Sequence, residues 1–340
     1  MRLYRLPKSE SIDDLTLVEA EAPRPARGQV VVRMRAASLN FRDLMVVTGG
    51  YGRGRVPPDL VPVSDGAGEV AAVGPDVSRV KPGDRVAGIF MQRWLGGEID
   101  AASSASALGG GIDGVLAEQV VFEADGLVHL PPHLSFEEGA TLPCAAVTAW
   151  NALMGLKPVQ PGQTVLTLGT GGVSIFALQF AHAAGARVIA TSSSDAKLDK
   201  AKALGADDGI NYKSVPEWQE KVRELTQGRG VDHVVEVGGA GTLLRSMQST
   251  RTGGLVHIIG GVSGSGSGGE VNSQTIIRHN VTLRGVYVGS REQFEAMNRA
   301  IALHNLRPAI DRVFPFTEAK AAYRHLQSRT HFGKVVIAIA

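Results

Sequence analysis

Short alternations of apolar and polar positions dominate the chain up to about Val128. Residues 29–36, Gln-Val-Val-Val-Arg-Met-Arg-Ala, show the period-two pattern that is typical of a half-buried β-strand. Residues 68–74 and 80–88 predict two more strands, separated by Pro/Gly turns. This spacing predicts a partly closed, barrel-like β domain. Residues 91–114 are rich in small residues and contain a glycine triplet, and we expect them to form a long mobile loop.

The pattern changes at Thr164, where strand-like runs begin to alternate with helical periodicity. The apolar runs predict strands over 165–168, 187–190, 231–237 and 255–259. The segments between them predict helices over 173–184, 196–204, 215–226 and 242–249. Because strands that alternate with helices form a parallel sheet covered on both faces, we expect a doubly wound α/β domain here.

The end of the chain returns to the character of its beginning. Residues 260–269 are rich in glycine and serine and predict a flexible loop, and residues 281–288 predict another strand. A helix over 294–303 and a final strand over 333–339 then resemble the amino-terminal region.

The length of 340 residues allows two domains with separate cores. We expect residues 1–145, completed by 289–340, to form a β-rich domain, and residues 146–288 to form the α/β domain. With 44% hydrophobic and 20% charged residues, the composition is that of an ordinary globular protein.

Charge and cysteine content exclude several classes of function. The net charge of +2 gives no electrostatic reason to expect nucleic acid or an anionic membrane as a partner. The single cysteine, Cys144, excludes an internal disulfide and any thiolate-rich metal site. No apolar run reaches transmembrane length and the first residues do not form a signal peptide, so we expect a cytoplasmic protein.

A glycine-rich turn joins the first α/β strand to its helix. Residues 169–174 read Gly-Thr-Gly-Gly-Val-Ser, a G-x-G-x-x-S variant of the dinucleotide-binding turn. The first glycine permits the tight turn, and the second lets the backbone approach a pyrophosphate. Ser174 is small enough for close packing, and its hydroxyl could cap the helix or reach a phosphate. The alternative is a glycine-rich turn without a ligand. We expect cofactor binding by Gly169, Thr170, Gly171, Gly172 and Val173.

The end of the next strand indicates which cofactor is bound. Proteins that prefer NAD place an acidic residue there to hold the ribose hydroxyls. Here the strand ends in three serines, Ser192 to Ser194, and the first acid is Asp195. Ser192, Ser193 and Lys197 offer donors for a 2′-phosphate, which favours NADP(H). The alternative is a serine-rich loop with a solvated lysine.

With these features, the chain resembles the medium-chain dehydrogenase/reductase superfamily. The resemblance covers essentially the whole sequence and rests on residues 81–86, 169–174, 197–206, 210–212 and 333–337, in this order. It implies a GroES-like catalytic domain wrapped around an inserted Rossmann domain, with the active site in the cleft. The glycine-rich turn and the insertion-like loop at 91–114 depart from the pattern of the superfamily's zinc-free quinone oxidoreductase branch.

The resemblance also shows where zinc ligands are missing. Zinc-dependent members carry a cysteine at the position of Asn40 and a Gly-His-Glu at the position of 63–65, which here is Val-Ser-Asp. Only the third ligand position keeps its cysteine, as Cys144. The four-cysteine structural zinc lobe of the family would fall near 91–114, which contain no cysteine. We therefore expect no bound metal.

The sequence is most similar to the zinc-free quinone oxidoreductase branch. In that branch an asparagine and a tyrosine line the nicotinamide pocket, which implies this role for Asn40 and Tyr51. A lysine and a tyrosine bind the 2′-phosphate of NADPH, which matches Lys197 and Tyr212. A threonine at the position of Thr148 packs against the nicotinamide ring. The set of expected cofactor-binding residues also includes Gly238 and Gly260.

These residues predict hydride transfer from NADPH to a quinone or an α,β-unsaturated carbonyl, because a conjugated acceptor needs less polarisation than a simple ketone. Asn40 and Tyr51 are the expected donors to the enolate, and Tyr51 could also deliver the proton. For Tyr51 the alternative is a surface aromatic, and for Asn40 an Asx turn. A zinc-free alcohol dehydrogenase or carbonyl reductase and a non-catalytic NADPH-binding regulatory protein remain as other functions.

Four further residues and the assembly state complete the expectations. Arg42 and Asp43 form either a pocket pair or an ion pair at a helix start. Cys144 is expected as a small buried residue and His182 as a packed or surface histidine, so neither is assigned a catalytic role. We expect a homodimer that continues the sheet through the edge strand at 281–288, and a small-molecule substrate.

Overall fold

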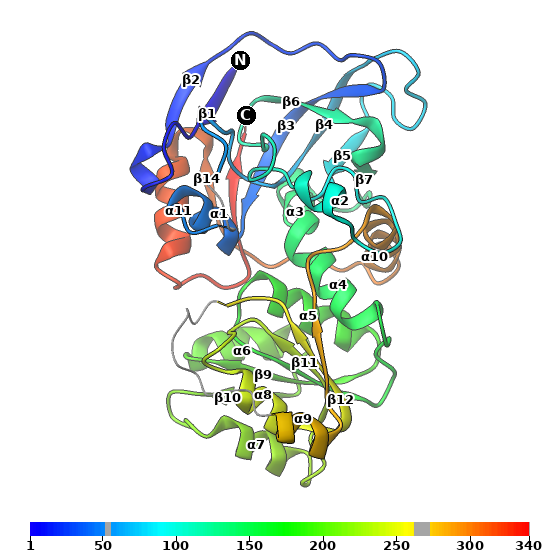
Figure 1. Cartoon of the computed structure of the whole chain (residues 1–340), viewed down its shortest axis with the longest axis vertical. Helices are drawn as coiled ribbons and strands as arrows, with labels where there is room; N and C mark the ends of the chain where they lie inside the picture. Colours follow the sequence, from blue (N-terminus) through cyan, green and yellow to red (C-terminus); the bar gives the residue numbers. More distant parts are fainter. Residues whose placement is uncertain (52–55, 262–272, 340) are drawn as a thin grey trace. The chain divides into compact units, whose positions relative to one another are not determined.

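The computed structural model describes residues 1–51, 56–261 and 273–339. The chain divides into two compact units (Figure 1). The β-rich unit contains Met1–Val147 and Gly289–Ala340, and the parallel-sheet unit contains Thr148–Val288.

A seven-stranded sheet forms the body of the β-rich unit, with the strand order β14-β15-β3-β4-β5-β7 and with β6 paired to β3. A separate antiparallel pair is formed by β1 (Arg2–Arg5) and β2 (Thr16–Glu19). The strands of the sheet are β3 (Gln29–Leu39), β4 (Asp65–Val73), β5 (Arg85–Gly88), β6 (Gln119–Glu123), β7 (Leu127–His129), β14 (Ile310–Pro315) and β15 (Lys334–Ala338).

The long strand β3 holds this sheet together because it pairs with β4, β6 and β15. Its alternating residues bury Val30, Val32 and Met34 in the core of the unit. The helices of the unit are α1 (Phe41–Val47), α2 (Ala101–Ala105), α3 (Phe136–Ala140), α10 (Arg291–Leu303) and α11 (Ala319–Gln327), and Leu142–Ala146 form a π-helical segment.

Residues 91–114 do not form the mobile loop that their composition predicts. They contain α2, and the side chains of Met91, Trp94 and Leu108 are buried. The glycines serve close packing: a side chain at Gly109 would collide with the backbone of Val63, and one at Gly110 with the guanidinium of Arg42. Composition alone cannot distinguish a glycine that gives freedom from one that gives room.

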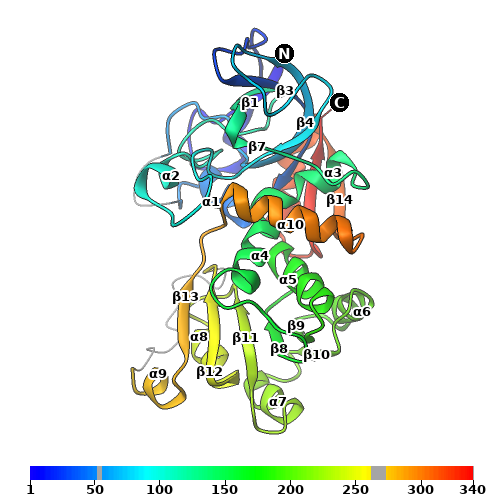
Figure 2. The same cartoon turned by 90° about the vertical axis from the view of Figure 1, so that its right-hand side faces the viewer.

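The parallel-sheet unit has a six-stranded sheet with the order β10-β9-β8-β11-β12-β13, and every neighbouring pair is parallel. Figure 2 shows this order from β13 at one edge to β10 at the other. The strands are β8 (Thr164–Thr167), β9 (Arg187–Ser192), β10 (Asp208–Asn211), β11 (Val231–Glu236), β12 (Thr250–Ile258) and β13 (Thr282–Gly285). The helices are α4 (Val147–Met154), α5 (Gly172–Ala183), α6 (Asp195–Ala203), α7 (Trp218–Leu225), α8 (Leu243–Ser249) and α9 (Ser273–His279).

Strand order reverses between β8 and β11, because β8, β9 and β10 run outward on one side and β11, β12 and β13 on the other. In sheets of this kind, ligands bind at such a switch point, beyond the carboxyl ends of the strands. The glycine-rich turn follows β8, so it lies at this point.

The doubly wound parallel sheet is confirmed, and so is the β-rich domain. The strand expected over 80–88 is shorter than predicted: only Arg85–Gly88 are extended, because Lys81 to Asp84 form a Pro/Gly turn. The expected loop at 260–269 lies mostly outside the described residues. Among the described helices, none is long and apolar enough to cross a membrane.

Candidate active site and cofactor-binding region

The glycine-rich turn leaves open space in front of its backbone. Gly169 has a φ of +72°, a left-handed conformation that favours glycine, and its N–H donates to Thr191 Oγ1 at 3.2 Å. Gly171 precedes the first residue of α5 and has an ordinary φ of −80°. A Cβ at either glycine would meet no heavy atom within 4 Å. Packing within the chain therefore does not require these glycines, and the open space fits a pyrophosphate that approaches the backbone.

Ser174, in the third position of the motif, bonds to the strand. Its buried hydroxyl donates to Leu168 O at 2.6 Å, across the turn. The two roles expected from sequence, a helix cap or a phosphate ligand, are therefore wrong for this hydroxyl. A serine suits the position because it is small and because it ties the first turn of α5 to the end of β8.

The residues expected around a 2′-phosphate meet at the ends of β9 and β10. Ser192 is the last residue of β9, and its carbonyl accepts a hydrogen bond from the N–H of Tyr212 at 3.0 Å. The Tyr212 side chain is 41% exposed. Ser193 is half-buried, and the half-buried Lys197 stands in the first turn of α6. Ser192 and Tyr212 thus lie at the neighbouring ends of β9 and β10, and Lys197 lies at the start of the helix that follows β9.

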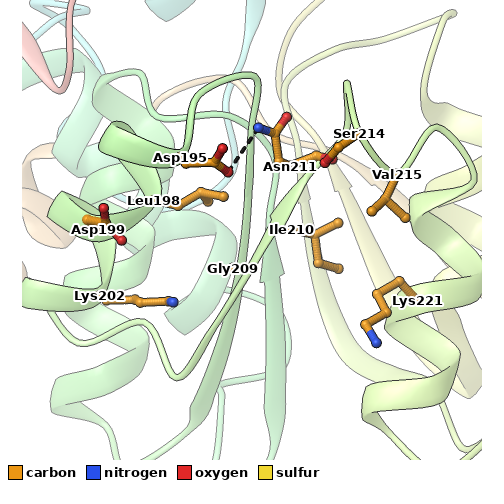
Figure 3. Close-up of a pocket in the computed structure, with 10 residues that line it drawn as sticks. All are labelled: Asp195, Leu198, Asp199, Lys202, Gly209, Ile210, Asn211, Ser214, Val215 and Lys221. Atoms are coloured by element: carbon orange, nitrogen blue, oxygen red, sulfur yellow. Dashed lines mark hydrogen bonds between the residues drawn. The ribbon is translucent and has the colours of Figure 1, made fainter.

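Asp195, the first acid after β9, is bound to a neighbour. Its Oδ1 accepts a hydrogen bond from Asn211 Nδ2 at 2.9 Å, and both side chains line a pocket between α6 and β10 (Figure 3). Leu198, Lys202 and Lys221 are also at this pocket. The glycine-rich turn contributes none of the described residues that line it. We therefore do not assign the pocket of Figure 3 to the pyrophosphate.

Gly238, another expected cofactor residue, is held by a carboxylate that sequence reasoning missed. Glu236 is fully buried at the end of β11 and accepts from the N–H groups of Gly238 (2.7 Å) and Gly239 (2.9 Å). It also accepts from Thr242 Oγ1 at 2.6 Å and from the Ser246 hydroxyl. An acid that closes an apolar strand is the signal that could have revealed it.

Gly260 and Thr148 are placed by their elements. Gly260 lies just after β12, and a Cβ there would approach Val237 O at 2.9 Å, so close packing alone explains this glycine. Thr148 is buried in the first turn of α4.

In the β-rich unit, the residues at the positions where zinc-dependent relatives carry metal ligands form a hydrogen-bonded cluster. Asn40 caps α1, Asp65 begins β4 directly after Ser64, and Cys144 lies in the π-helical segment. Asn40 Nδ2 lies 3.5 Å from Ser64 Oγ, which donates to Asp65 Oδ1 at 2.7 Å. Asp65 Oδ2 accepts from the N–H of Cys144 at 2.9 Å. Burial raises the pKa of Asp65 and that of the Cys144 thiol.

Backbone strain accompanies this cluster. Val63, directly before Ser64, has a φ of +72°, which a β-branched residue rarely adopts. Such a residue persists only where its surroundings hold it, at a cost of about 1–3 kcal/mol. Here Gly109 and Gly114 pack against its backbone, and its carbonyl accepts from Val115 N–H at 2.8 Å.

Lys334, the first residue of β15, reaches into the same cluster and was not predicted as a site residue. It is 3% exposed. Its Nζ donates to Leu39 O at 2.7 Å and to Asn40 Oδ1 at 2.5 Å. Burial lowers its pKa, and the neighbouring Asp65 opposes that effect. A lysine that opens an otherwise apolar strand, Val335 to Ile337, is the sequence signal for this position.

Arg42 and Asp43 form a buried pair that also holds Tyr51. Their side chains approach to 3.6 Å, and burial raises the pKa of Asp43 to about 6. The Arg42 guanidinium lies 4.5 Å from the centroid of the Tyr51 ring and donates to Leu108 O at 2.8 Å. Burial disfavours its charge, but Asp43 and Tyr51 raise the pKa of Arg42 above its ordinary value. His182, by contrast, is exposed on α5 and lies far along the chain from this pair.

Comparison with known proteins identifies the family. Residues 26–132 match the alcohol dehydrogenase GroES-like domain, and residues 172–302 match the zinc-binding dehydrogenase family. A zinc-type alcohol dehydrogenase-like protein of Schizosaccharomyces pombe is 46% identical over 332 residues, 96% of each chain. The chain belongs to the medium-chain dehydrogenase/reductase superfamily.

Other members of the superfamily differ in the cofactor or substrate that their names state. The bovine (Bos taurus) quinone oxidoreductase-like protein 2 is 29% identical over 99% of this chain and 93% of its own. A solved NAD-dependent alcohol dehydrogenase is 34% identical, with a TM-score of 0.91 and complete coverage of both chains. A mycobacterial protein solved with NADPH is 26% identical, with a TM-score of 0.82 and the same coverage. The chain is therefore a medium-chain dehydrogenase/reductase oxidoreductase, and a pyridine nucleotide is its cofactor class.

The cluster around Asn40 does not fit a zinc ion, although zinc stands in the names of the matched family and the yeast relative. Zinc takes three or four ligands from Cys, His and carboxylates. Within the described ranges, no three His, Cys, Asp or Glu side chains gather where they could hold a metal ion. Both oxygens of Asp65 already accept hydrogen bonds, and burial keeps Cys144 in its thiol form.

Proposed function

We propose that this medium-chain dehydrogenase/reductase is an NADPH-dependent enzyme that reduces a quinone or an α,β-unsaturated carbonyl without zinc. The observation that carries the proposal is the buried cluster at Asn40. Hydrogen-bond donors and a lysine stand there, where zinc-dependent members have metal ligands. Donors suit a conjugated acceptor, because hydride adds to carbon and the charge that develops spreads to oxygen.

The binding of NADPH is proposed from the carboxyl edge of the parallel sheet. The open space at Gly169 and Gly171 supports a pyrophosphate there. Ser192 and Tyr212 are joined by a backbone hydrogen bond, Lys197 stands in the first turn of α6, and we assign these three residues to the 2′-phosphate. The Asp195 carboxylate accepts a hydrogen bond from Asn211. Because it is already engaged within the chain, it is less suited to hold the ribose hydroxyls, and this supports the preference for the phosphorylated cofactor. When bound, NADPH supplies the hydride.

In the β-rich unit, we propose that Asn40 and Tyr51 act on the substrate. Asn40 donates an amide N–H to the oxygen that becomes negative. Tyr51 donates its hydroxyl proton to the enolate, directly or through water. Arg42 holds the Tyr51 ring by stacking at 4.5 Å.

A substrate panel tests the proposed reaction. Quinones and enones should oxidise NADPH faster than matched saturated ketones, and activity should persist in chelator with substoichiometric zinc in the purified protein. Saturated primary alcohols should be poor substrates, because a bound metal is what lowers the pKa of an alcohol. Alcohol oxidation that chelator abolishes and zinc restores would overturn the zinc-free reaction.

The cofactor is tested by binding. NADPH should bind at least about tenfold more tightly than NADH, because a charge-assisted hydrogen bond to the phosphate contributes roughly 1.5–3 kcal/mol. Lys197→Ala should reduce the difference in affinity between the two cofactors, because it weakens the binding of NADPH and leaves that of NADH unchanged. Equal dissociation constants for the two cofactors in the native protein would refute the preference.

The names of several relatives state alcohol dehydrogenase activity, so a zinc-free alcohol dehydrogenase or carbonyl reductase is the second candidate. The same panel separates the two, because this candidate requires saturated ketones to be reduced as fast as enones. If the protein binds NADPH but none of the acceptors in the panel leads to NADPH oxidation, the regulatory function is supported instead.

A further inference from the structure

Four buried ionisable side chains surround Asn40: Arg42, Asp43, Asp65 and Lys334. None is more than 9% exposed, and the two acids balance the two bases. Buried charges are tolerated only where they are paired and hydrogen-bonded. Such a balanced set places two carboxyl groups and two basic groups in the neighbourhood of one neutral amide.

Asn40 is held at two points by members of this set. Asp43 Oδ2 accepts from the backbone N–H of Asn40 at 2.7 Å, and Lys334 Nζ donates to its side-chain oxygen at 2.5 Å. An ammonium group has donors only, so the Asn40 atom that faces it must be the oxygen. The second hydrogen bond of Lys334, to Leu39 O at 2.7 Å, fixes the ammonium against the main chain just before Asn40.

We propose that Lys334 is a positioning residue that keeps the Asn40 carboxamide in one of its two orientations. With its oxygen bound to Lys334, the carboxamide turns its NH2 group toward Ser64, 3.5 Å away, and offers donors on that side. This inference rests on the proposed function, in which Asn40 donates to the substrate oxygen. Without Lys334 the carboxamide can rotate by half a turn and present its own oxygen, which repels the developing negative charge.

Three variants separate this role from charge balance alone. Lys334→Met removes the donors at nearly constant length. Lys334→Met/Asp65→Asn removes one charge of each sign, and an asparagine there can still accept from the Cys144 N–H and donate to Ser64 Oγ. Lys81→Met is the matched control, because Lys81 is an exposed turn residue of the same unit.

We expect Lys334→Met to lower kcat for an enone by roughly ten- to a hundredfold, with the NADPH dissociation constant unchanged within about threefold. The double variant should recover thermal stability lost by the single variant but keep the low kcat. Lys81→Met should match the native protein. A native kcat in Lys334→Met, or a kcat that returns together with stability in the double variant, would overturn the proposal.

A second readout does not depend on turnover. In the native protein, the side-chain amide protons of Asn40 should give one resolved pair of NMR signals, assigned by its loss in Asn40→Ala. In the double variant this pair should shift and broaden as the carboxamide exchanges between orientations. An unchanged Asn40 pair would contradict the positioning role. Failure of the native protein to reduce any enone or quinone would instead refute the proposed function, while the NMR result would still decide the role of Lys334.

Discussion

At the scale of single residues, the site depends on groups whose neighbours decide their chemistry. Asn40 and Tyr51 are ordinary polar residues in sequence, but the structure surrounds one with Lys334 and Asp43 and stacks the other on Arg42. Cys144, at the one position where the family's zinc ligand persists, is a half-buried thiol with a raised pKa. The chemistry of this cluster is therefore that of fixed hydrogen-bond donors.

Replacement of Tyr51 by phenylalanine tests its proposed role. The ring and its contact with Arg42 remain, and only the hydroxyl is lost. If that hydroxyl is a donor or the acid, kcat should fall by roughly ten- to a thousandfold with little change in NADPH affinity. Steady-state kinetics with an enone measure this. A fall of less than about twofold would leave water as the proton source and make Tyr51 a wall of the pocket.

Replacement of Gly171 by alanine tests the open space at the glycine-rich turn. Its φ of −80° suits alanine and its Cβ would meet no atom, so the melting temperature should stay within about 2 °C of the native value. NADPH should bind more than about tenfold more weakly, because the methyl group lies where the backbone would approach the pyrophosphate.

Gly169→Ala provides the contrast to this variant. At a φ of +72° alanine is strained, so this variant should lose about 1 kcal/mol of stability as well as cofactor affinity. Native NADPH affinity in Gly171→Ala would show that no ligand approaches the turn.

At the scale of elements, β11 and β12 carry a buried histidine pair that was not singled out from sequence. His233 Nδ1 and His257 Nε2 lie 3.1 Å apart with their rings stacked. Burial lowers the pKa of His233 to about 4, although the neighbouring Asp232 carboxylate acts to raise it. Burial lowers the pKa of His257 to about 3. Repulsion from Arg284 also lowers the pKa of His257.

The free energy of unfolding should therefore decrease as the pH is lowered through the acidic range. Between about pH 6.5 and the folded-state values of about 4 and about 3, the unfolded chain binds more protons than the folded one. Stability rises with pH wherever that holds, so it should decrease steadily as pH falls from about 6.5 to 4.

His257→Gln should reduce this slope. The glutamine can still hydrogen-bond to His233, but one titrating group is gone. The difference in unfolding free energy between pH 7 and pH 5 should shrink by about 1–2 kcal/mol relative to the native protein, as measured by urea titration at both values. His182→Gln is the control, because it replaces an exposed histidine outside the pair in the same way. An equal slope in native protein and His257→Gln would refute this account.

At the scale of the whole molecule, we propose a homodimer through the edge of the parallel sheet. β13 is the terminal strand of that sheet, and Ile277 and Tyr287 on either side of it are 67% and 44% exposed. An exposed edge with apolar neighbours is a template for pairing with a second copy.

Sedimentation velocity at micromolar concentration should show a dimer, and Leu283→Pro in β13 should convert it to a monomer, since proline cannot donate to a strand ladder. Leu303, which is 81% exposed on α10, offers the control Leu303→Ser, which should remain a dimer. A native monomer would refute the dimer and leave the fold unaffected.

The sequence by itself determined the two kinds of fold and much of the order of elements. Period-two alternation predicted β3, and apolar runs between helical segments predicted the parallel strands β8, β9, β11 and β12. These patterns are local consequences of which face of an element is buried, so a single sequence records them. The glycine-rich turn was readable for the same reason, because its spacing is a property of one strand, one turn and one helix.

Only the tertiary structure decided which distant residues act together. Lys334 meets Asn40 because β15 pairs with β3 across almost 300 positions of sequence, and no local pattern records that register. By composition the glycines at 109 and 110 predict flexibility, but in the structure they allow close contact with Val63 and Arg42, which are distant in sequence. Side-chain chemistry depends on burial and on partners, and the packing of non-adjacent elements sets both.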